Sequence, residues 1–295
     1  MSRSGRGAPS TACWPLADAV GLAEVRRALA EDRASEDVTT RLLGTLTARP
    51  AAARFVAEAR CVVAGLPVAA LVFQELDRGA CLEPLAREGA WVESGASIAT
   101  VRARAGALLA GERVALNFLQ RLSGIATLTR RAVDAVAGTT ARITHTRKTT
   151  PGLRALEQYA VRVGGGVDNR GSLAEAVLWK DNHWALLSGR GTTLAEALAG
   201  APPGLPVVVE VETDTQLEEA LAAGVTHILA DNQPPSRIAA WVRRAGGAVT
   251  IQASGGITPE RARDYAAAGA TLVSIGALTH SAPAAPLACE IALVS

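Results

Sequence analysis

The chain is 295 residues long and nearly neutral, with 30 basic and 28 acidic side chains. That length accommodates two ordinary domains, or one large barrel with an extension. The formal net charge of +2 gives no general attraction for nucleic acid or for an anionic membrane, so any anion site must be local. The longest uncharged apolar run, 61–74, is too short to span a bilayer, and the first residues lack the apolar segment of a secretory signal.

The cysteines at 13, 61, 81 and 289 are scattered, without a CxxC pair and without histidines at metal-ligand spacing. This distribution predicts four reduced cysteines and a cytoplasmic protein. It gives no support to a structural zinc site.

The first third of the chain predicts an α+β domain, which we place at residues 1–112. Its strands alternate between polar and apolar residues, as half-buried antiparallel strands do. In chain order we expect a helix at 16–32, a polar loop at 35–40, a strand at 53–63, a helix at 64–77 and two strands joined by a glycine-containing turn at 91–103. A long helical stretch at 108–138 follows, and Ser123-Gly124 predicts an interruption in it.

From residue 141 onwards, short apolar runs alternate with amphipathic helical segments. Strands that are buried on both faces and alternate with helices predict parallel βαβ units. Repeated units of this kind predict an α/β barrel, or an open doubly wound sheet. The expected strands are 141–146, 176–180, 206–212, 227–231, 248–254 and 271–276.

Polar residues or glycines recur at the carboxyl end of every predicted strand, which favours the barrel. In α/β barrels such residues converge on one mouth, where they can reach a ligand. A solvated loop face would not need every charge to stand at the last residue of a strand. The strand-end residues are Arg147 and Lys148, Lys180, Glu210 and Glu212, Asp231, Ser254 with Gly255 and Gly256, and finally Gly276.

These residues divide into a cationic and an anionic half. Arginine and lysine bind carboxylates and phosphates, whereas strand-end carboxylates suit a hydrated Mg²⁺ or sugar hydroxyls. The glycine-rich segments 254–258 and 274–281 offer backbone N–H groups of the kind that bind phosphate. His183 and His280 fit a structural role as well as a catalytic one. Phosphate, Mg²⁺, sugar and carboxylate together describe phosphoribosyl diphosphate and an aromatic acid.

A series of motifs in matching order resembles the quinolinate phosphoribosyltransferase family, also called carboxylating nicotinate-nucleotide pyrophosphorylases. The motifs are GERVALNFLQRLSGIAT, TRKTTPGLR, GGGVDNR, LWKDNH, VEVE, ILADN, ASGGIT and SIGALTHSAP. The family reaction joins quinolinate to phosphoribosyl diphosphate and gives nicotinate mononucleotide, CO₂ and pyrophosphate in NAD biosynthesis. The resemblance implies an N-terminal α/β sandwich and an incomplete, open α/β barrel at 113–295, with a C-terminal tail that packs back on the first domain.

The resemblance also implies a role for each site residue, and a homodimer in which each active site borrows Arg113 from its neighbour. Ligands of the acid and the phosphates would be Arg113, Arg147, Lys148, Asn169, Arg170 and Lys180. Glu210 or Glu212, with Asp231, would hold Mg²⁺ and the ribose hydroxyls, and Glu210 is our choice for the metal. Ser254, Gly255, Gly256 and Gly276 would hold the 5′-phosphate, and the catalytic residues would be Lys148, Lys180, Glu210 and Asp231.

Three positions depart from the family pattern. The usual NHR is DNR here, the usual DTRK is HTRK, and the usual EASGG is QASGG, which places Asn169, His145 and Gln252 at the altered positions. Asn169 keeps one neutral hydrogen bond of roughly half the strength of a charge-assisted one. We therefore expect weaker binding of a dianion. If quinolinate is the acid, Asn169→His should raise the efficiency, and if another acid is, the same change should harm the reaction.

The departures leave two alternatives to the quinolinate enzyme. One is a related phosphoribosyltransferase for another heteroaromatic acid, in secondary metabolism or in the branch associated with molybdenum transport. The other is a ligand-binding relative without catalysis. The lysine of LWKDNH, Lys180, disfavours the molybdenum-associated branch, and intact Lys148 and Asp231 disfavour a non-catalytic protein.

Overall fold

The computed structural model describes residues 21–189 and 191–294, which divide into two compact units. Residues 21–123 and 284–294 form the first unit, and residues 124–283 form the second. The chain passes from one unit to the other within helix α4 (Ala105–Ala135). The boundary expected after residue 112 falls inside this helix.

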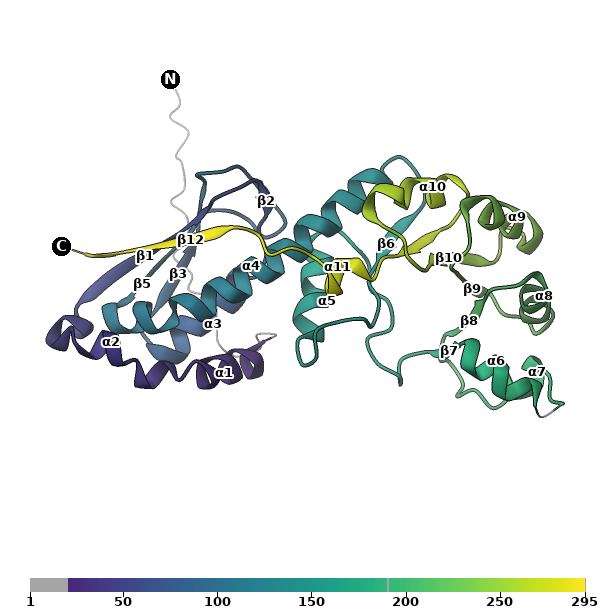
Figure 1. Ribbon diagram of the computed structural model, residues 1–295, viewed down its shortest axis with the longest axis horizontal. Coiled ribbons are helices and arrows are strands. Elements are labelled where there is room, and N and C mark those ends of the chain that lie inside the picture. Colours follow the sequence, from purple (N-terminus) through teal and green to yellow (C-terminus); the bar gives the residue numbers. More distant parts are fainter. Residues whose placement is uncertain (1–20, 190, 295) are drawn as a thin grey trace, which may run out of the picture. The chain divides into compact units, whose positions relative to one another are not determined.

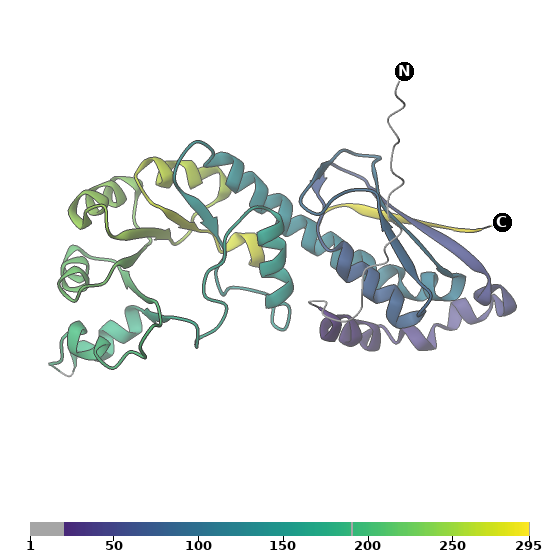
Figure 2. The same ribbon diagram turned by 180° about the vertical axis from the view of Figure 1, so that it is seen from behind.

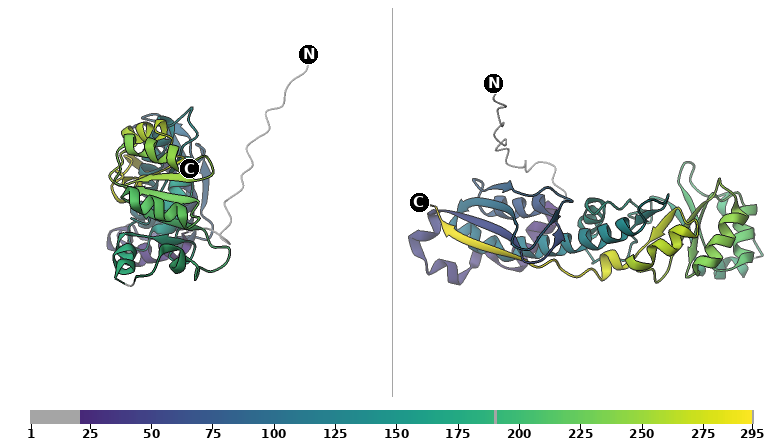
Figure 3. Two further views of the ribbon diagram at one scale, coloured as in Figure 1. Left: turned by 90° about the vertical axis from the view of Figure 1, so that its right-hand side faces the viewer. Right: turned by 90° about the horizontal axis from the view of Figure 1, so that it is seen from above.

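The first unit is built on a four-stranded sheet with the strand order β12-β1-β5-β3. Strand β1 (Pro50–Ala57) runs antiparallel to β5 (Ser97–Arg104) on one side and to β12 (Leu287–Leu293) on the other. Figures 1 and 3 show β12, from the end of the chain, lying beside β1. The remaining strands are β2 (Cys61–Val62), β3 (Cys81–Pro84) and β4 (Trp91–Val92).

Helices cover one face of this sheet (Figure 1). Alternate residues of β1 are buried, and Phe55 lies 6.0 Å from Phe73 of helix α3 between ring centroids. This contact joins the apolar face of the strand to the nearly all-buried α3, as in a two-layer sandwich. The helices of the unit are α1 (Leu22–Glu31), η1 (Ala34–Glu36), α2 (Val38–Arg41), η2 (Gly44–Ala48), α3 (Leu66–Leu76) and the first part of α4.

Two local expectations in this unit are wrong. The segment 35–40 is not a plain loop, because the Asp37 side chain accepts hydrogen bonds from the backbone N–H groups of Thr39 and Thr40 and caps α2. The helix α4 is not interrupted at Ser123. The Ser123 hydroxyl instead donates to Ala64 O at 3.1 Å and accepts from Ala64 N at 3.0 Å, so this serine ties α4 to a distant segment.

The prediction of four reduced cysteines is also wrong, because Cys81 is disulfide-bonded. Cys61 and Cys289 are free. Burial raises the pKa of both free thiols, that of Cys289 to about 12. Cys13 lies outside the described residues.

The second unit holds a six-stranded sheet of parallel strands in the order β6-β11-β10-β9-β8-β7. All of these strands fall within the predicted apolar runs, and the fold class is confirmed. The strands are β6 (Arg142–Thr144), β7 (Val177–Trp179), β8 (Val207–Val211), β9 (His227–Asp231), β10 (Thr250–Ser254) and β11 (Leu272–Ser274). The edge strands β6 and β7 do not pair with each other among the described residues, so the barrel is open.

Helices follow the strands and lie along the outer side of the curved sheet, as Figure 2 shows for α8, α9 and α10. This arrangement leaves the other face of the sheet for the side chains at the strand ends. The helices are α5 (Arg154–Val163), α6 (Asp181–Ser188), α7 (Leu194–Leu198), α8 (Asp214–Ala222), α9 (Pro235–Ala245), η3 (Pro259–Arg261), α10 (Ala262–Ala267) and α11 (Ala277–His280). No helix in the described chain is long and apolar enough to cross a membrane.

Candidate active site

Strand register places the predicted polar residues of the second unit on one face of its sheet. Glu210 of β8 and Gln252 of β10 both stand opposite Leu229 of β9. Because side chains alternate along a strand, residues two positions further on point to the same side. Asp231 and Ser254, which pair with each other, therefore lie on the face of Glu210 at the carboxyl ends.

Glu210 forms the central ion pair of this face. Its Oε2 lies 3.0 Å from Lys180 Nζ, and the glutamate is only 7% exposed. Burial raises the pKa of Glu210, the lysine opposes that rise, and the nearby charge of Asp231 adds to it. Glu212 is exposed. Of the two glutamates that the sequence left open, Glu210 is the one held beside Lys180 and Asp231.

Helix α6 fixes the position of this ion pair. The backbone N–H of Lys180 donates to Nδ1 of His183 at 2.9 Å, and Trp184 Nε1 donates to the backbone oxygen of Glu210 at 2.8 Å. His183 thus caps the start of α6, which gives this histidine a structural role. Trp184 was not singled out from the sequence, since its partner is a backbone atom of another strand.

Hydrogen bonds hold the loop after β6, which carries Arg147 and Lys148. Thr279 Oγ1 donates to the backbone oxygen of Lys148 at 2.8 Å, and Lys148 N donates to Thr146 Oγ1 at 3.1 Å. The buried carboxylate of Glu157 accepts from the backbone N–H and the hydroxyl of Thr150, at 3.0 and 2.8 Å. The loop is therefore rigid although its two cations form no ion pair with a carboxylate of the described chain.

Arg147 and Arg170 lie close enough for their charges to interact. Burial lowers the pKa of Arg170, and the charge of Arg147 lowers it further, while Glu210 opposes this. In the described chain, the buried Nε of Arg147 has no hydrogen-bond partner. Two cations held together with an unused donor have the chemistry that binding of an anion requires.

The glycine-rich turn after β10 is tightly packed against the end of β9. Gly255 has φ +92°, and a Cβ atom there would lie 2.2 Å from Asn232 Oδ1 and 2.6 Å from Asn232 N. Asn232 itself has φ 53°, and its Nδ2 donates to Asp231 Oδ2 at 2.7 Å. Asn232 was missed from the sequence, although it follows directly after the strand-end aspartate.

Gly276, after β11, brings this part of the site close to the cationic loop. A Cβ atom at Gly276 would lie 3.3 Å from Lys148 Cδ and 3.1 Å from His280 Nε2. The residues of the second unit that the structure brings to one region are thus Arg147, Lys148, Arg170, Lys180, Glu210, Asp231, Ser254, Gly255, Gly256 and Gly276. Arg113 lies in the first unit, where it lines a pocket of about 430 Å³ with residues 32–38 and the start of α4.

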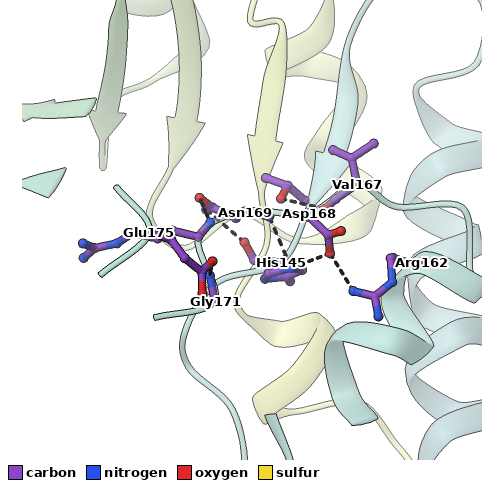
Figure 4. A network of polar contacts seen from close by, with 9 residues as sticks. His145, Arg162, Val167, Asp168, Asn169, Gly171 and Glu175 are labelled. Carbon is purple, nitrogen blue, oxygen red and sulfur yellow. Dashed lines mark hydrogen bonds and ion pairs between the residues drawn. The ribbon is translucent and has the colours of Figure 1, made fainter. Parts of the chain in front are cut away.

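The three departures from the family pattern are buried or committed to other protein groups. Gln252 is 1% exposed, and its amide bridges Nε2 of His227 at 2.6 Å and the hydroxyl of Ser274 at 2.5 Å. His145 is 0% exposed and contacts Asn169 (Figure 4). Both amide atoms of Gln252 therefore bond to residues of the neighbouring strands, and neither is left free to bind a ligand at the mouth of the barrel.

Comparison with known proteins agrees with this architecture. Residues 37–123 match the model of the quinolinate phosphoribosyl transferase N-terminal domain, and residues 125–289 match that of the C-terminal domain. An open parallel barrel with charged strand ends, joined to this N-terminal domain, defines a phosphoribosyltransferase architecture. The chain belongs to the quinolinate phosphoribosyltransferase family.

Individual relatives cover most of the chain. The carboxylating nicotinate-nucleotide pyrophosphorylase of Mycobacterium leprae (strain TN) is 43% identical over 266 residues, 87% of this chain and 92% of its own. The probable enzyme of that name from Bacillus subtilis (strain 168) is 39% identical over 241 residues, 82% of this chain and 83% of its own. The crystal structure of NadC from Streptococcus pyogenes has a TM-score of 0.88 at 35% identity and covers 94% of this chain and 99% of its own.

The glycine turn makes a first prediction. Gly255→Ala must displace Asn232 and strain a positive φ, so it should lower the free energy of unfolding by about 2–4 kcal/mol. Gly256→Ala is the matched control, because it shares the positive φ but has nothing within 4 Å of the new Cβ, and should cost about 1 kcal/mol. Thermal unfolding of both variants measures this difference in stability. Equal melting temperatures would show that the Asn232 contact does not constrain the turn.

The buried carboxylate makes a second prediction. A raised pKa in the folded state means that the stability from Glu210 is full below its unfolded value of 4.5 and is lost as pH rises through the folded pKa. Glu210→Gln removes this loss, and Lys180, which is 44% exposed, stays hydrated. The melting temperature of the variant relative to the wild type should therefore rise with pH above about 4.5.

The control for this prediction is Glu212→Gln, which changes an exposed carboxylate at the end of the same strand. We expect its melting curves to follow those of the wild type at every pH. If Glu210→Gln were instead destabilised progressively as pH rose, the ion pair with Lys180 would outweigh the cost of burial, and the sign of our argument would be wrong.

Proposed function

We propose that the chain transfers phosphoribose from phosphoribosyl diphosphate to quinolinate, with release of CO₂ and pyrophosphate, in cytoplasmic NAD biosynthesis. The observation that carries this proposal is the 43% identity to a carboxylating nicotinate-nucleotide pyrophosphorylase over 87% of the chain. The charged strand ends expected for this reaction lie together in the second unit. The product would be nicotinate mononucleotide.

The cationic residues of the mouth would bind the acid and the diphosphate. Arg147 and Arg170 repel each other unless an anion lies between them, and a dicarboxylate would supply that anion. Lys148 would complement the arginines as a mobile point charge. Lys180, already beside Glu210, would orient that carboxylate and remain half-exposed toward ligand.

The acidic residues would bind the ribose and a magnesium ion. Mg²⁺ in such sites is held by one or two carboxylates and by the phosphates of the substrate, with waters completing its shell. Glu210 and Asp231 on neighbouring strands fit that pattern, and no group of three or more His, Cys, Asp or Glu ligands occurs in the described chain. When bound, the ion would neutralise charge on the pyrophosphate.

The glycine-rich turns would hold the 5′-phosphate of the ribose. Gly255 and Gly256 have positive φ, which exposes successive backbone N–H groups to a ligand, as anion-binding turns do. Gly276 has an ordinary helical φ of −65° at the start of α11, and would offer backbone N–H groups beside Lys148. The absence of side chains at these positions allows a phosphate to approach the backbone closely.

The site would act mainly by positioning and by electrostatics. The bond between ribose C1 and the pyrophosphate oxygen breaks as the pyridine nitrogen forms its bond to C1. The carboxylate next to that nitrogen then leaves as CO₂, and its electron pair stays on the ring carbon until a proton replaces it. Arg147, Arg170 and Lys148 would stabilise that negative charge.

One observation favours a second candidate, a phosphoribosyltransferase for another heteroaromatic acid. The family pattern has a histidine where this chain has Asn169, and Asn169 uses both atoms of its amide on protein groups, His145 O at 3.2 Å and Arg170 N at 2.8 Å. An acid with one carboxylate would need fewer donors than quinolinate does.

The test is an assay of the wild-type protein with phosphoribosyl diphosphate, Mg²⁺ and either quinolinate or nicotinate. Release of CO₂ and pyrophosphate with quinolinate supports the proposed reaction. Pyrophosphate release with nicotinate, and none with quinolinate, would replace it with the second candidate. No turnover of either acid would favour a ligand-binding relative, provided that binding of phosphoribosyl diphosphate is observed.

Loss of Arg147 makes a third prediction. Arg147→Ala removes a charge-assisted contact of about 1.5–3 kcal/mol, so kcat/KM with quinolinate should fall roughly 10- to 150-fold. Because the loop is held by Thr279 and Glu157, the melting temperature should hardly move. Full activity, or unfolding of the variant, would refute the role given to this arginine.

We further propose a homodimer in which Arg113 of one chain completes the site of the other. Arg113 lines its pocket together with Asp37 and Val38. Next to this pocket, the apolar side chains Val38 and Leu42 are 73% and 86% exposed. A second copy of the chain would cover them.

The shared site makes a fourth prediction. Arg113→Ala and Lys148→Ala should each be inactive, and mixing them with subunit exchange should restore part of the activity. Heterodimers would contain one site in which both residues are intact. Two Lys148→Ala preparations mixed in the same way are the control. No recovery after exchange has been verified by mass would mean that Arg113 acts within its own chain or not at all.

A further inference from the structure

The buried residue His145 contacts Asn169 twice, once through its imidazole and once through its backbone oxygen. The backbone N–H of Asn169 donates to His145 Nε2 at 3.2 Å, and Asn169 Nδ2 donates to the backbone oxygen of His145 at 3.2 Å (Figure 4). Asn169 is thus fixed through its backbone and its side chain by one residue. His145 follows β6 directly, so this contact joins the strand to the loop at 168–170.

These contacts define the protonation state of His145. Nε2 accepts from a backbone N–H, so a neutral ring carries its proton on Nδ1, which is buried and has no hydrogen-bond partner in the described chain. Burial lowers the pKa of His145, which keeps the ring neutral. Asp168 Oδ1 lies 3.4 Å from the same nitrogen and 2.8 Å from a guanidinium nitrogen of Arg162. Burial alone would raise the pKa of Asp168, but the Arg162 contact lowers it, so Asp168 is an anion satisfied by Arg162.

The effect of His145 continues to Arg170. The side-chain oxygen of Asn169 accepts from the backbone N–H of Arg170 at 2.8 Å, and the Arg170 guanidinium donates to Ala176 O at 3.2 Å. The backbone and the guanidinium of Arg170 are thereby both fixed. The backbone is fixed by Asn169, which His145 holds in turn. Arg170 is also the cation whose charge interacts with that of Arg147.

We propose that His145 is a positioning residue, whose imidazole holds Asn169 and through it sets Arg170 for a carboxylate of the acid substrate. This inference rests on the proposed function, because it names the acid as the ligand of Arg170. In this chain the base at 145 lies against an acid at 168, with 3.4 Å between His145 Nε2 and Asp168 Oδ1.

This arrangement reverses what the sequence suggested for Asn169. Asn169→His alone would place a second imidazole against His145 and remove the amide that holds Arg170. We therefore expect a lower kcat/KM with quinolinate, not a higher one. A gain in efficiency would show that Asn169 faces the acid directly, and would overturn the proposal.

The direct test compares two substitutions at the same buried position. His145→Phe keeps an aromatic ring but removes the acceptor, and should raise KM for quinolinate about tenfold. KM for phosphoribosyl diphosphate should stay within about twofold, because Arg170 would not be its main ligand. His145→Gln restores an acceptor oxygen and should recover most of the loss. Equal behaviour of the two variants, or equal effects on both substrates, would overturn the proposal.

The matched control is His227→Phe. His227 is also a histidine whose pKa burial lowers, but its ring bonds to Gln252 at the beginning of β9 and not to the loop at 168–170. We expect this variant to lose melting temperature without a change in KM for quinolinate. A similar rise in KM would attribute the effect of His145→Phe to general loosening of the sheet.

Amide hydrogen exchange separates this inference from the proposed function. The Asn169 amide should exchange faster in His145→Phe than in the wild type, and His145→Gln should restore its protection. If the wild-type protein does not turn over quinolinate, the proposed function fails, and this exchange still decides whether His145 positions the loop. Unchanged protection in His145→Phe would overturn the inference while the proposed function stands.

Discussion

The carboxylate of Glu210 is only 7% exposed and is held beside a cation, with Lys180 Nζ at 3.0 Å. The cost of removing these charges from water often exceeds their attraction, so such a pair contributes little to stability by itself. The opposite face of the sheet supplies the stability instead, through buried apolar residues such as Val209, Ile228 and Ile251. The parallel strands thus hold a costly charge pair where their carboxyl ends meet.

Much of this fold could be predicted from local sequence because its second unit repeats one pattern. Each apolar run is a strand, each amphipathic segment a helix, and polar residues mark the strand ends. The first unit depends on contacts that no local pattern contains. Strand β12 pairs with β1 across most of the chain, and Arg54 on β1 forms an ion pair with Glu290 on β12. Ser123 of α4 bonds to the backbone of Ala64, which is far from it in sequence.

The candidate site shows the same division between what spacing predicts and what only packing decides. The spacing in the sequence identified the residue types at the mouth. Glu210 and Glu212 are two positions apart and would point to the same face of a strand, so only burial and the distance to Lys180 distinguish them. The altered positions looked like lost pocket charges. In the structure Gln252 bonds to two neighbouring strands, and His145 bonds to a backbone N–H. A sequence indicates which residue has changed. The effect of the change depends on the partner to which the new side chain bonds.

The supports of Lys148 and Arg170 have one chemical property in common. Lys148 and Arg170 are held through backbone oxygens or backbone N–H groups, by the hydroxyl of Thr279 and the amide of Asn169. The nearby carboxylate of Glu157 is used on Thr150 instead. A carboxylate partner would have fixed these cations equally well, but it would have cancelled the charge before a ligand arrived. Neutral supports keep the loops rigid and leave the positive charge available, which is what binding of a multiply charged anion requires.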